Sequence, residues 1–249
     1  MRERRTLLLG APIDIYAPGE LMAELERALE SDGPKMIFAT NPEKVMRARA
    51  DAELMKALDA ADFLIPDGIG AVIGLRLLGK GRTARVTGID LMGRLLESAE
   101  KRGRRVFIFG ARPEVVKDAA VRILERHPRL ELAGYRDGYV PESEHAALVG
   151  EINARGTDIL FAALGSPRQE KWLTRWKPHL RARICMGVGG SLDILSGRLS
   201  RSPRWVQRAG LEWLYRFLKE PARFWKRGLG LVRYLFVLLK EMIAPEPAP

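Results

Sequence analysis

The sequence predicts an α/β fold in which a mainly parallel sheet is covered on both faces by helices. Short, almost continuously apolar runs such as 105–109 and 158–163 are typical of strands that are buried on both faces. They alternate with helical segments of about 10–15 residues, the pattern of a parallel sheet. The chain has 249 residues, of which 47% are hydrophobic and 29% charged, so it is ordinary globular material with enough length for one good core.

The strands are predicted, in chain order, at 35–39, 63–65, 105–109, 130–133, 158–163 and 184–188. Helices are expected at 42–60, 69–78, 90–102 and around 114–116. Asn41 and Pro42 predict the start of the first of these, because Asn is a favoured N-cap and Pro a favoured first helical residue. After about Gly197 the pattern changes to helical segments at 205–219 and 222–242, interrupted at Pro221. We therefore expect three parts: an α/β domain at 1–197, a basic helical appendage at 198–243 and a disordered tail at 244–249.

The predicted appendage is strongly basic and rich in aromatic residues. Residues 201–241 hold ten Lys and Arg against three Asp and Glu, in a chain whose net charge is +11. At 100° per residue, the basic side chains between Arg223 and Lys240 fall within an arc of about 140°, and apolar side chains fill the opposite side. This pattern favours an anionic membrane surface over ordinary docking on the core. Basic and aromatic residues also suit nucleic acid, but no nucleic-acid-binding motif accompanies them.

Other features bound the cellular context. No apolar run reaches the roughly 18 residues of a membrane span, and the apolar stretch after the basic N-terminus is too short for a signal peptide. The single cysteine, Cys185, has no partner for an internal disulfide, which fits a reducing compartment. It lies in a predicted buried strand, so we interpret it as a core residue.

In sheets of this kind, ligands bind beyond the carboxyl ends of the strands. The candidates there are Asn41, Asp67, Gly110, 165–169 and 189–193. Asp67 leads because it directly follows a strand, although an isolated Asp-Gly pair is often only a turn. Gly110 gives a weak phosphate-loop signal, since no Walker lysine follows. The absence of a Gly-x-Gly-x-x-Gly fingerprint argues against NAD.

The segment Gly165-Ser-Pro-Arg-Gln-Glu-Lys-Trp172 predicts a helix start. Ser166 fits an N-cap and Gln169 its partner in a capping box. The same helix N-terminus is also suited to a phosphate, so the sequence leaves both interpretations open. The glycines of 187–190 allow close backbone approach after the last strand.

Arg85 lies in a loop before a helix. A surface arginine usually has no special role, but beside a diphosphate it would offer two-point charge-assisted hydrogen bonds. The three histidines show no metal-ligand spacing, and no Asp-x-Asp follows a strand to hold a divalent metal.

Eight segments occur together in an order that resembles the WecG/TagA/CpsF glycosyltransferases (glycosyltransferase family 26), from about Met36 to Arg227. The matching stretches are 41–43, 64–70, 85–91, 109–113, 135–139, 165–172, 187–193 and 208–223. The resemblance implies a Rossmann-like α/β domain with a C-terminal membrane-targeting appendage. It also implies an inverting enzyme that moves a sugar, most often N-acetylmannosamine, from a UDP-sugar to an undecaprenyl-diphosphate-linked N-acetylglucosamine, in teichoic acid or surface polysaccharide synthesis.

By the same resemblance, Asp67 is the general base that deprotonates the acceptor hydroxyl. The donor would be held by Arg85, Gln169, Asn41, Asp193 and Gly110. The appendage would close over the site with Arg216, Arg223 and Lys226, the last in place of a family arginine. The family pattern Thr-x-Asn reads Ala39-Thr40-Asn41 here, so Thr40 is carried as a substitute for the threonine.

The resemblance further implies a peripheral protein at the cytoplasmic face of the membrane that needs no metal and binds no nucleic acid. A homo-oligomer is one option for its assembly. Three alternatives stay open: the same family with UDP-glucose or UDP-N-acetylmannosaminuronic acid as donor, a non-catalytic basic membrane- or nucleic-acid-binding protein, and another sugar-nucleotide enzyme such as an epimerase or dehydrogenase.

Overall fold

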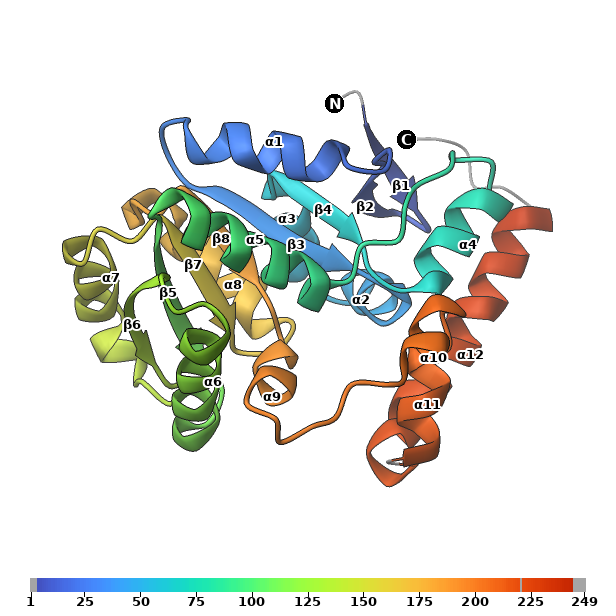
Figure 1. Ribbon diagram of the computed structural model, residues 1–249. Coiled ribbons are helices and arrows are strands. Elements are labelled where there is room, and N and C mark those ends of the chain that lie inside the picture. The colour runs from blue at the N-terminus through green and yellow to red at the C-terminus, as the bar shows by residue number, and fades with distance from the viewer. Residues whose placement is uncertain (1–3, 220, 244–249) are drawn as a thin grey trace.

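A six-stranded parallel sheet forms the centre of the protein (Figure 1). The computed structural model describes residues 4–219 and 221–243, without the side chains of 216, 217 and 221–229. The strand order is β4-β3-β8-β7-β5-β6, and each neighbouring pair is parallel. The strands are β3 (Lys35–Thr40), β4 (Phe63–Pro66), β5 (Arg105–Gly110), β6 (Glu131–Arg136), β7 (Ile159–Ala163) and β8 (Ile184–Gly187). The predicted α/β class and all six predicted strands are confirmed.

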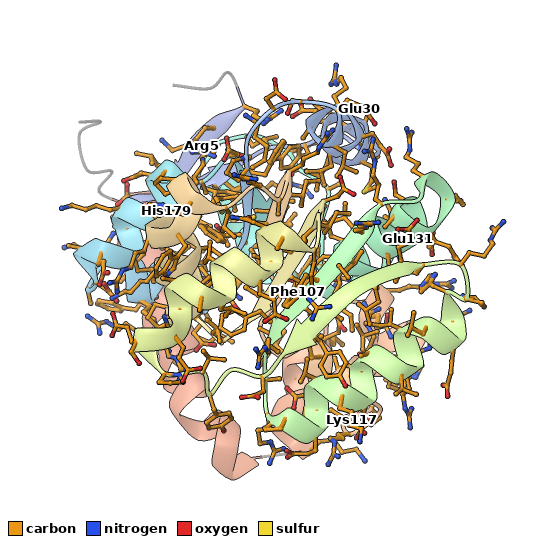
Figure 2. All side chains as sticks on the ribbon, turned by 90° about the vertical axis from the view of Figure 1, so that its left-hand side faces the viewer. Arg5, Glu30, Phe107, Lys117, Glu131 and His179 are labelled. Atoms are coloured by element: carbon orange, nitrogen blue, oxygen red, sulfur yellow. The ribbon has the colours of Figure 1, made fainter. Side chains whose placement is uncertain are left out.

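Helices cover both faces of this sheet and form two apolar cores. Because side chains alternate along a strand, Phe107 and Phe109 face one core while Val106 and Ile108 face the other. Phe107 lies in the interior of the molecule (Figure 2). The first core is closed by α2 (Pro42–Ala48), α3 (Ala52–Ala60), α4 (Ile69–Leu77), α7 (His145–Ala154), α8 (Arg168–Trp176) and α12 (Pro221–Ile243). The second core is closed by α1 (Glu20–Leu29), α5 (Gly88–Arg102), α6 (Pro113–Arg126) and α9 (Ser191–Leu195).

Residues 5–60 differ from the sequence-based expectation at two places. The helix expected over 42–60 is divided into α2 and α3, because the Asp51 carboxylate accepts a hydrogen bond from Leu54 N (3.0 Å) and starts a new helix. An antiparallel hairpin of β1 (Arg5–Leu8) and β2 (Ala11–Asp14), missed in the sequence, precedes the sheet. Its turn places both Leu9 (φ 51°) and Gly10 (φ 82°) in the left-handed region, a conformation that a leucine does not signal.

The hairpin is tied to the sheet through the buried carboxylate of Asp14. This side chain accepts hydrogen bonds from Arg5 Nε (2.8 Å), Tyr16 Oη (3.1 Å) and the backbone N–H of Leu64 (2.8 Å). Charge-assisted bonds of this kind satisfy a carboxylate that burial would otherwise destabilise. Since Leu64 belongs to β4, the hairpin supports the strand that ends just before Asp67.

Three helices end the described chain: α10 (Arg204–Arg208), α11 (Glu212–Lys219) and α12. Gly210, at φ 73°, separates the first two, so the continuous helix expected over 205–219 is divided. One face of α12 docks on the first core, where Tyr234 and Leu238 are buried. The Tyr234 hydroxyl donates to Gly70 O in α4 (3.0 Å), and burial raises the pKa of Tyr234 to about 12.

Another face of α12 stays apolar and exposed, with Val232, Leu235, Phe236 and Leu239 reaching solvent. Docking and an uncovered apolar face thus occur on the same helix. None of the helices within residues 4–219 and 221–243 combines the length and hydropathy of a membrane span.

We predict that Gly74→Ala weakens the docking of α12. A Cβ at Gly74 would overlap the Tyr234 hydroxyl and lie 3.1 Å from Leu8 Cδ1. Overpacking of this kind costs about 1–3 kcal/mol, so the urea midpoint should fall and a protease should cleave α12 sooner. Gly93→Ala is the matched control, because a Cβ there meets no atom within 4 Å in α5 and should raise stability slightly. Equal stability of the two variants would contradict this packing.

Cys185 is fully buried in β8, as predicted for a core residue. Burial raises the pKa of its thiol, so the reactive thiolate is disfavoured.

Candidate functional site

The carboxyl ends of the strands lie along one edge of the sheet and carry most of the predicted site positions. Thr40 ends β3 and pairs in register with Pro66 at the end of β4, so Asn41 and Asp67 leave neighbouring strands side by side. Gly187 ends the next strand along the sheet, β8, and Ala163 and Gly110 end β7 and β5. The expectation that these chain segments converge at one edge is confirmed.

Asp67 is partly exposed at this edge. Its backbone N–H donates to Thr40 O (2.9 Å), which fixes the turn after β4, and Gly68 follows at φ 87°. The loop that contains Arg85 reaches the same turn, because Val86 N donates to Pro66 O (3.1 Å). A carboxylate suited to general-base chemistry and a guanidinium suited to a diphosphate therefore lie on adjoining loops.

Arg85 is held by the C-terminal helices. Its Nη2 donates to Gln207 O (2.6 Å), and its Nη1 lies 3.6 Å from Glu212 Oε2. Glu212 Oε1 lies 3.6 Å from Arg201 Nε, and Arg201 makes a two-point pair with Asp90 (2.6 and 2.9 Å). Hydrogen bonds from the Arg201 guanidinium hold the pKa of Asp90 below its usual value. This series of ion pairs runs from Arg85 through Glu212 and Arg201 to Asp90, so it begins and ends in the segment 85–90.

The same helices contact the residues that follow Asp67. Gly210 packs so closely on Ile69 that a Cβ there would lie 2.9 Å from the Ile69 Cβ. The Tyr234 hydroxyl bonds to Gly70. The C-terminal helices thus pack against the start of α4 and the loop before α5, both of which follow Asp67 in sequence.

Thr40 and Ala39 face opposite sides of β3, as neighbours in a strand do. Thr40 is fully buried, and its Oγ1 has no hydrogen-bond partner among the described residues. A hydroxyl at position 40 therefore does not occupy the place that a threonine at 39 would have. Asn41 caps α2 as predicted, since its Oδ1 accepts from Lys44 N (2.9 Å).

The capping box predicted from Ser166 to Gln169 is wrong. Pro167, after a cis peptide bond, precedes α8, and no side chain caps the helix. Gln169 instead turns inward: its Oε1 accepts from Gly189 N (3.0 Å), and its Nε2 donates to Glu170 Oε1 (3.0 Å). With both amide atoms bonded inside the protein, Gln169 joins α8 to the loop after β8.

Glu170 and Lys44 form a buried ion pair beneath this amide. Lys44 Nζ lies 2.6 Å from Glu170 Oε1, and the exposed fractions of the two side chains are 6% and 0%. Burial raises the pKa of Glu170, but the Lys44 ammonium and the hydrogen bonds from Lys44 and Gln169 outweigh it, so the pKa is lowered overall. The pair therefore anchors α8, which carries Gln169, to α2, which Asn41 caps.

Gly110 and Asp193 are two further predicted site positions. Gly110, at φ 125°, passes so close to β7 that a Cβ would lie 2.5 Å from the Ala163 carbonyl carbon. Asp193 lies in the first turn of α9 and is partly exposed. Of the appendage residues, Arg216, Arg223 and Lys226 belong to α11 and α12, but their side chains lie outside the described part of the structure.

Sequence reasoning missed three side chains of this region: Lys44, Glu170 and Glu212. The signal for the first two is weak, since each is one charged residue on an apolar helix face, and their 126-residue separation hides the pairing. Within the described ranges, no three His, Cys, Asp or Glu side chains gather as a metal site would require.

Comparison with known proteins gives consistent results. Residues 6–247 match the glycosyl transferase WecG/TagA/CpsF family. The N-acetylglucosaminyldiphosphoundecaprenol N-acetyl-beta-D-mannosaminyltransferase of Bacillus subtilis (strain 168) is 36% identical over 206 residues, 83% of this chain and 79% of that protein. The protein of the same name from Bacillus spizizenii (strain W23) is 37% identical over 213 residues, 86% of this chain and 82% of that protein. The family match covers nearly the whole chain, and on this evidence the chain belongs to the WecG/TagA/CpsF family of glycosyl transferases.

Proposed function

We propose that this protein transfers N-acetylmannosamine from a UDP-sugar to an undecaprenyl-diphosphate-linked N-acetylglucosamine. The observation that carries the proposal is the 36–37% identity, over more than four fifths of this chain, to two proteins named for this transfer. The site agrees with it, because Asp67 and Arg85 lie on adjoining loops at the carboxyl edge of the sheet. Teichoic acid or surface-polysaccharide synthesis is the process that such a product serves.

In the proposed reaction, the Asp67 carboxylate accepts the proton of the acceptor hydroxyl. The hydroxyl oxygen attacks the anomeric carbon of the donor as the bond from that carbon to the UDP oxygen breaks, so the configuration inverts. Negative charge then grows on the diphosphate, where guanidinium groups stabilise it most strongly. Arg85 supplies one such group, and we assign Arg216 and Arg223, with Lys226, to the same charge.

Of the remaining site positions, we assign some to the donor and others to support of the sheet edge. Asn41, directly after β3, and Asp193, in the first turn of α9 beyond the neighbouring strand β8, flank the donor. Gln169 fixes the loop after β8, because its Oε1 accepts a hydrogen bond from Gly189 N (3.0 Å). Thr40 and Gly110 support the edge by packing.

We further propose that residues 1–197 are the catalytic domain and 198–243 an appendage that meets the membrane. Val232, Leu235, Phe236 and Leu239 expose an apolar face on α12, next to the exposed Arg233. Such a helix lies in the interfacial plane of an anionic bilayer, with its apolar side toward the acyl chains. The site of action that we propose is the cytoplasmic face, where a UDP-sugar and a lipid-linked acceptor meet.

The test is transfer from a panel of UDP-sugars to a short-chain lipid-diphosphate N-acetylglucosamine, with EDTA present and mass spectrometry as the readout. We expect the mass gain of one N-acetylhexosamine, from UDP-N-acetylmannosamine only. A gain from UDP-glucose or the uronic acid would replace the donor assignment, and failure to bind UDP would overturn the family mechanism. Repeating the assay with acceptor in vesicles tests the appendage, since anionic lipid should raise the rate.

A further inference from the structure

Glu212 is a charged residue that the proposed chemistry does not use, although its carboxylate lies between two guanidinium groups. Glu212 Oε2 is 3.6 Å from Arg85 Nη1, and Glu212 Oε1 is 3.6 Å from Arg201 Nε. The Arg85 and Glu212 side chains are only 22% and 17% exposed. Because water is largely excluded from this pair, it is screened less than a surface ion pair.

Glu212 is itself fixed from several directions. The Ser202 hydroxyl donates to its Oε1 (3.4 Å). Arg201 is anchored by its two bonds to Asp90, whose Oδ2 also accepts from Thr87 Oγ1 (2.6 Å) at the start of α5. The carboxylate therefore meets Arg85 from a defined position.

Among the described residues, the Arg85 guanidinium finds its hydrogen-bond and ion-pair partners on the C-terminal helices, since Gln207 lies in α10 and Glu212 in α11. Two of its nitrogens are engaged there, while a guanidinium carries five N–H donors. A phosphate can thus bind the remaining donors of a guanidinium whose plane is already fixed. If the helices moved away, Arg85 would lose these partners and its orientation.

We infer that Glu212 is a positioning residue that orients Arg85 toward the donor diphosphate and couples donor binding to docking of the C-terminal helices. This inference rests on the proposed function, in which Arg85 contacts the diphosphate. A group that is oriented before the ligand arrives gives tighter binding, because less conformational freedom is lost on binding. Coupling is reciprocal, so UDP must in turn stabilise the docked helices.

The experiment is a double-mutant cycle on UDP affinity, measured by calorimetry with the full chain. We expect Glu212→Gln to weaken UDP binding by about tenfold, Arg85→Ala by at least as much, and the double variant by no more than Arg85→Ala. In the transfer assay, Glu212→Gln should raise the donor KM with a smaller effect on kcat. A purely structural role predicts instead that the two losses multiply.

Glu131→Gln is the matched control. Glu131 pairs with Arg105 (3.1 Å) at the amino ends of β5 and β6, the opposite edge of the sheet, and Figure 2 labels it there. Its loss should leave UDP affinity unchanged.

Hydrogen exchange supplies an independent readout. UDP should slow exchange at 201–212 in the wild-type protein and not in Glu212→Gln. Wild-type affinity in Glu212→Gln, or multiplying losses in the cycle, would overturn the inference while the proposed function stands. Absence of UDP binding by the wild-type protein would overturn both.

Discussion

Asp67→Asn is expected to lower the rate of sugar transfer by about 10²–10⁴-fold, the usual contribution of a general base. Asparagine keeps the size of the side chain but cannot take up the proton of the acceptor hydroxyl. The backbone bond from residue 67 to Thr40 O (2.9 Å) does not involve the carboxylate, so the turn should persist. Initial rates by mass spectrometry, with UDP affinity by calorimetry, measure the two effects separately.

Asp32→Asn is the control for this variant, because Asp32 is exposed in the turn before β3, at the other end of the strand. It should transfer sugar at the wild-type rate. Unfolding midpoints of the two variants should agree with that of the wild-type protein. A transfer rate for Asp67→Asn within threefold of the control, on the order of 1 kcal/mol or less in barrier height, would remove the base assignment.

Lys44→Met is expected to destabilise the folded protein by about 3–5 kcal/mol, the range for breaking a buried ion pair by removing one partner. It leaves the Glu170 carboxylate without the ammonium 2.6 Å away, in a place where its side chain is fully buried. Glu170 Oε2 already has no partner among the described residues, and the neutral hydrogen bond from Gln169 Nε2 to Oε1 (3.0 Å) does not replace the lost charge. Urea denaturation near neutral pH is the measurement.

The stability deficit of Lys44→Met should depend on pH through the ionisation of Glu170. In the wild-type protein the pKa of Glu170 is lowered, so its contribution is present above the unfolded-state pKa and is lost as pH falls through the folded-state pKa. In Lys44→Met, burial raises that pKa, since the opposing ammonium is gone. The deficit of the variant should therefore shrink as the pH falls and the carboxyl becomes neutral.

Two further variants test the mechanism. Lys44→Met/Glu170→Gln should recover much of the loss, because both charges are removed and Gln169 Nε2 can still donate to an oxygen at position 170. Lys171→Met, next to Glu170 on α8, removes partly exposed pairs with Asp51 and Glu53, and should change stability much less. A Lys44→Met variant as stable as Lys171→Met would show that the buried pair does not contribute.

The strands can be predicted from the sequence because a strand that is buried on both faces needs apolar side chains at successive positions, as in 105–109. The sequence also places Asn41 and Asp67 at the correct edge, since a strand end is a local feature. The turn of the hairpin escapes such reasoning, because Leu9 is placed in the left-handed region by its surroundings. The role of Gln169 cannot be predicted in this way either. Its side chain bonds to Gly189 N and Glu170 Oε1 instead of capping the helix, and the fold brings Gly189 into reach.

The positions of charged partners are the least accessible from sequence. Arg85 and Gln207 are 122 residues apart, and no periodicity links them. The family resemblance indicated that Arg85 serves the donor, yet the identity of its neighbours depends on how the C-terminal helices pack. Long-range contacts of this kind are therefore known only from the fold.

The two ends of the described chain meet on one helix. Leu8 of β1 and Tyr234 of α12 both approach Gly74 in α4, the helix that begins just after Asp67. In chain order, β1 comes before α4 and α12 comes after it, so Leu8 is translated before Gly74 and Tyr234 after it. During synthesis, the surface of α4 that Tyr234 covers is therefore exposed until α12 has been translated. A polypeptide that ends before α12 lacks the Tyr234 hydroxyl, so Gly70 O and the surface at Gly74, just after Asp67, lose this partner.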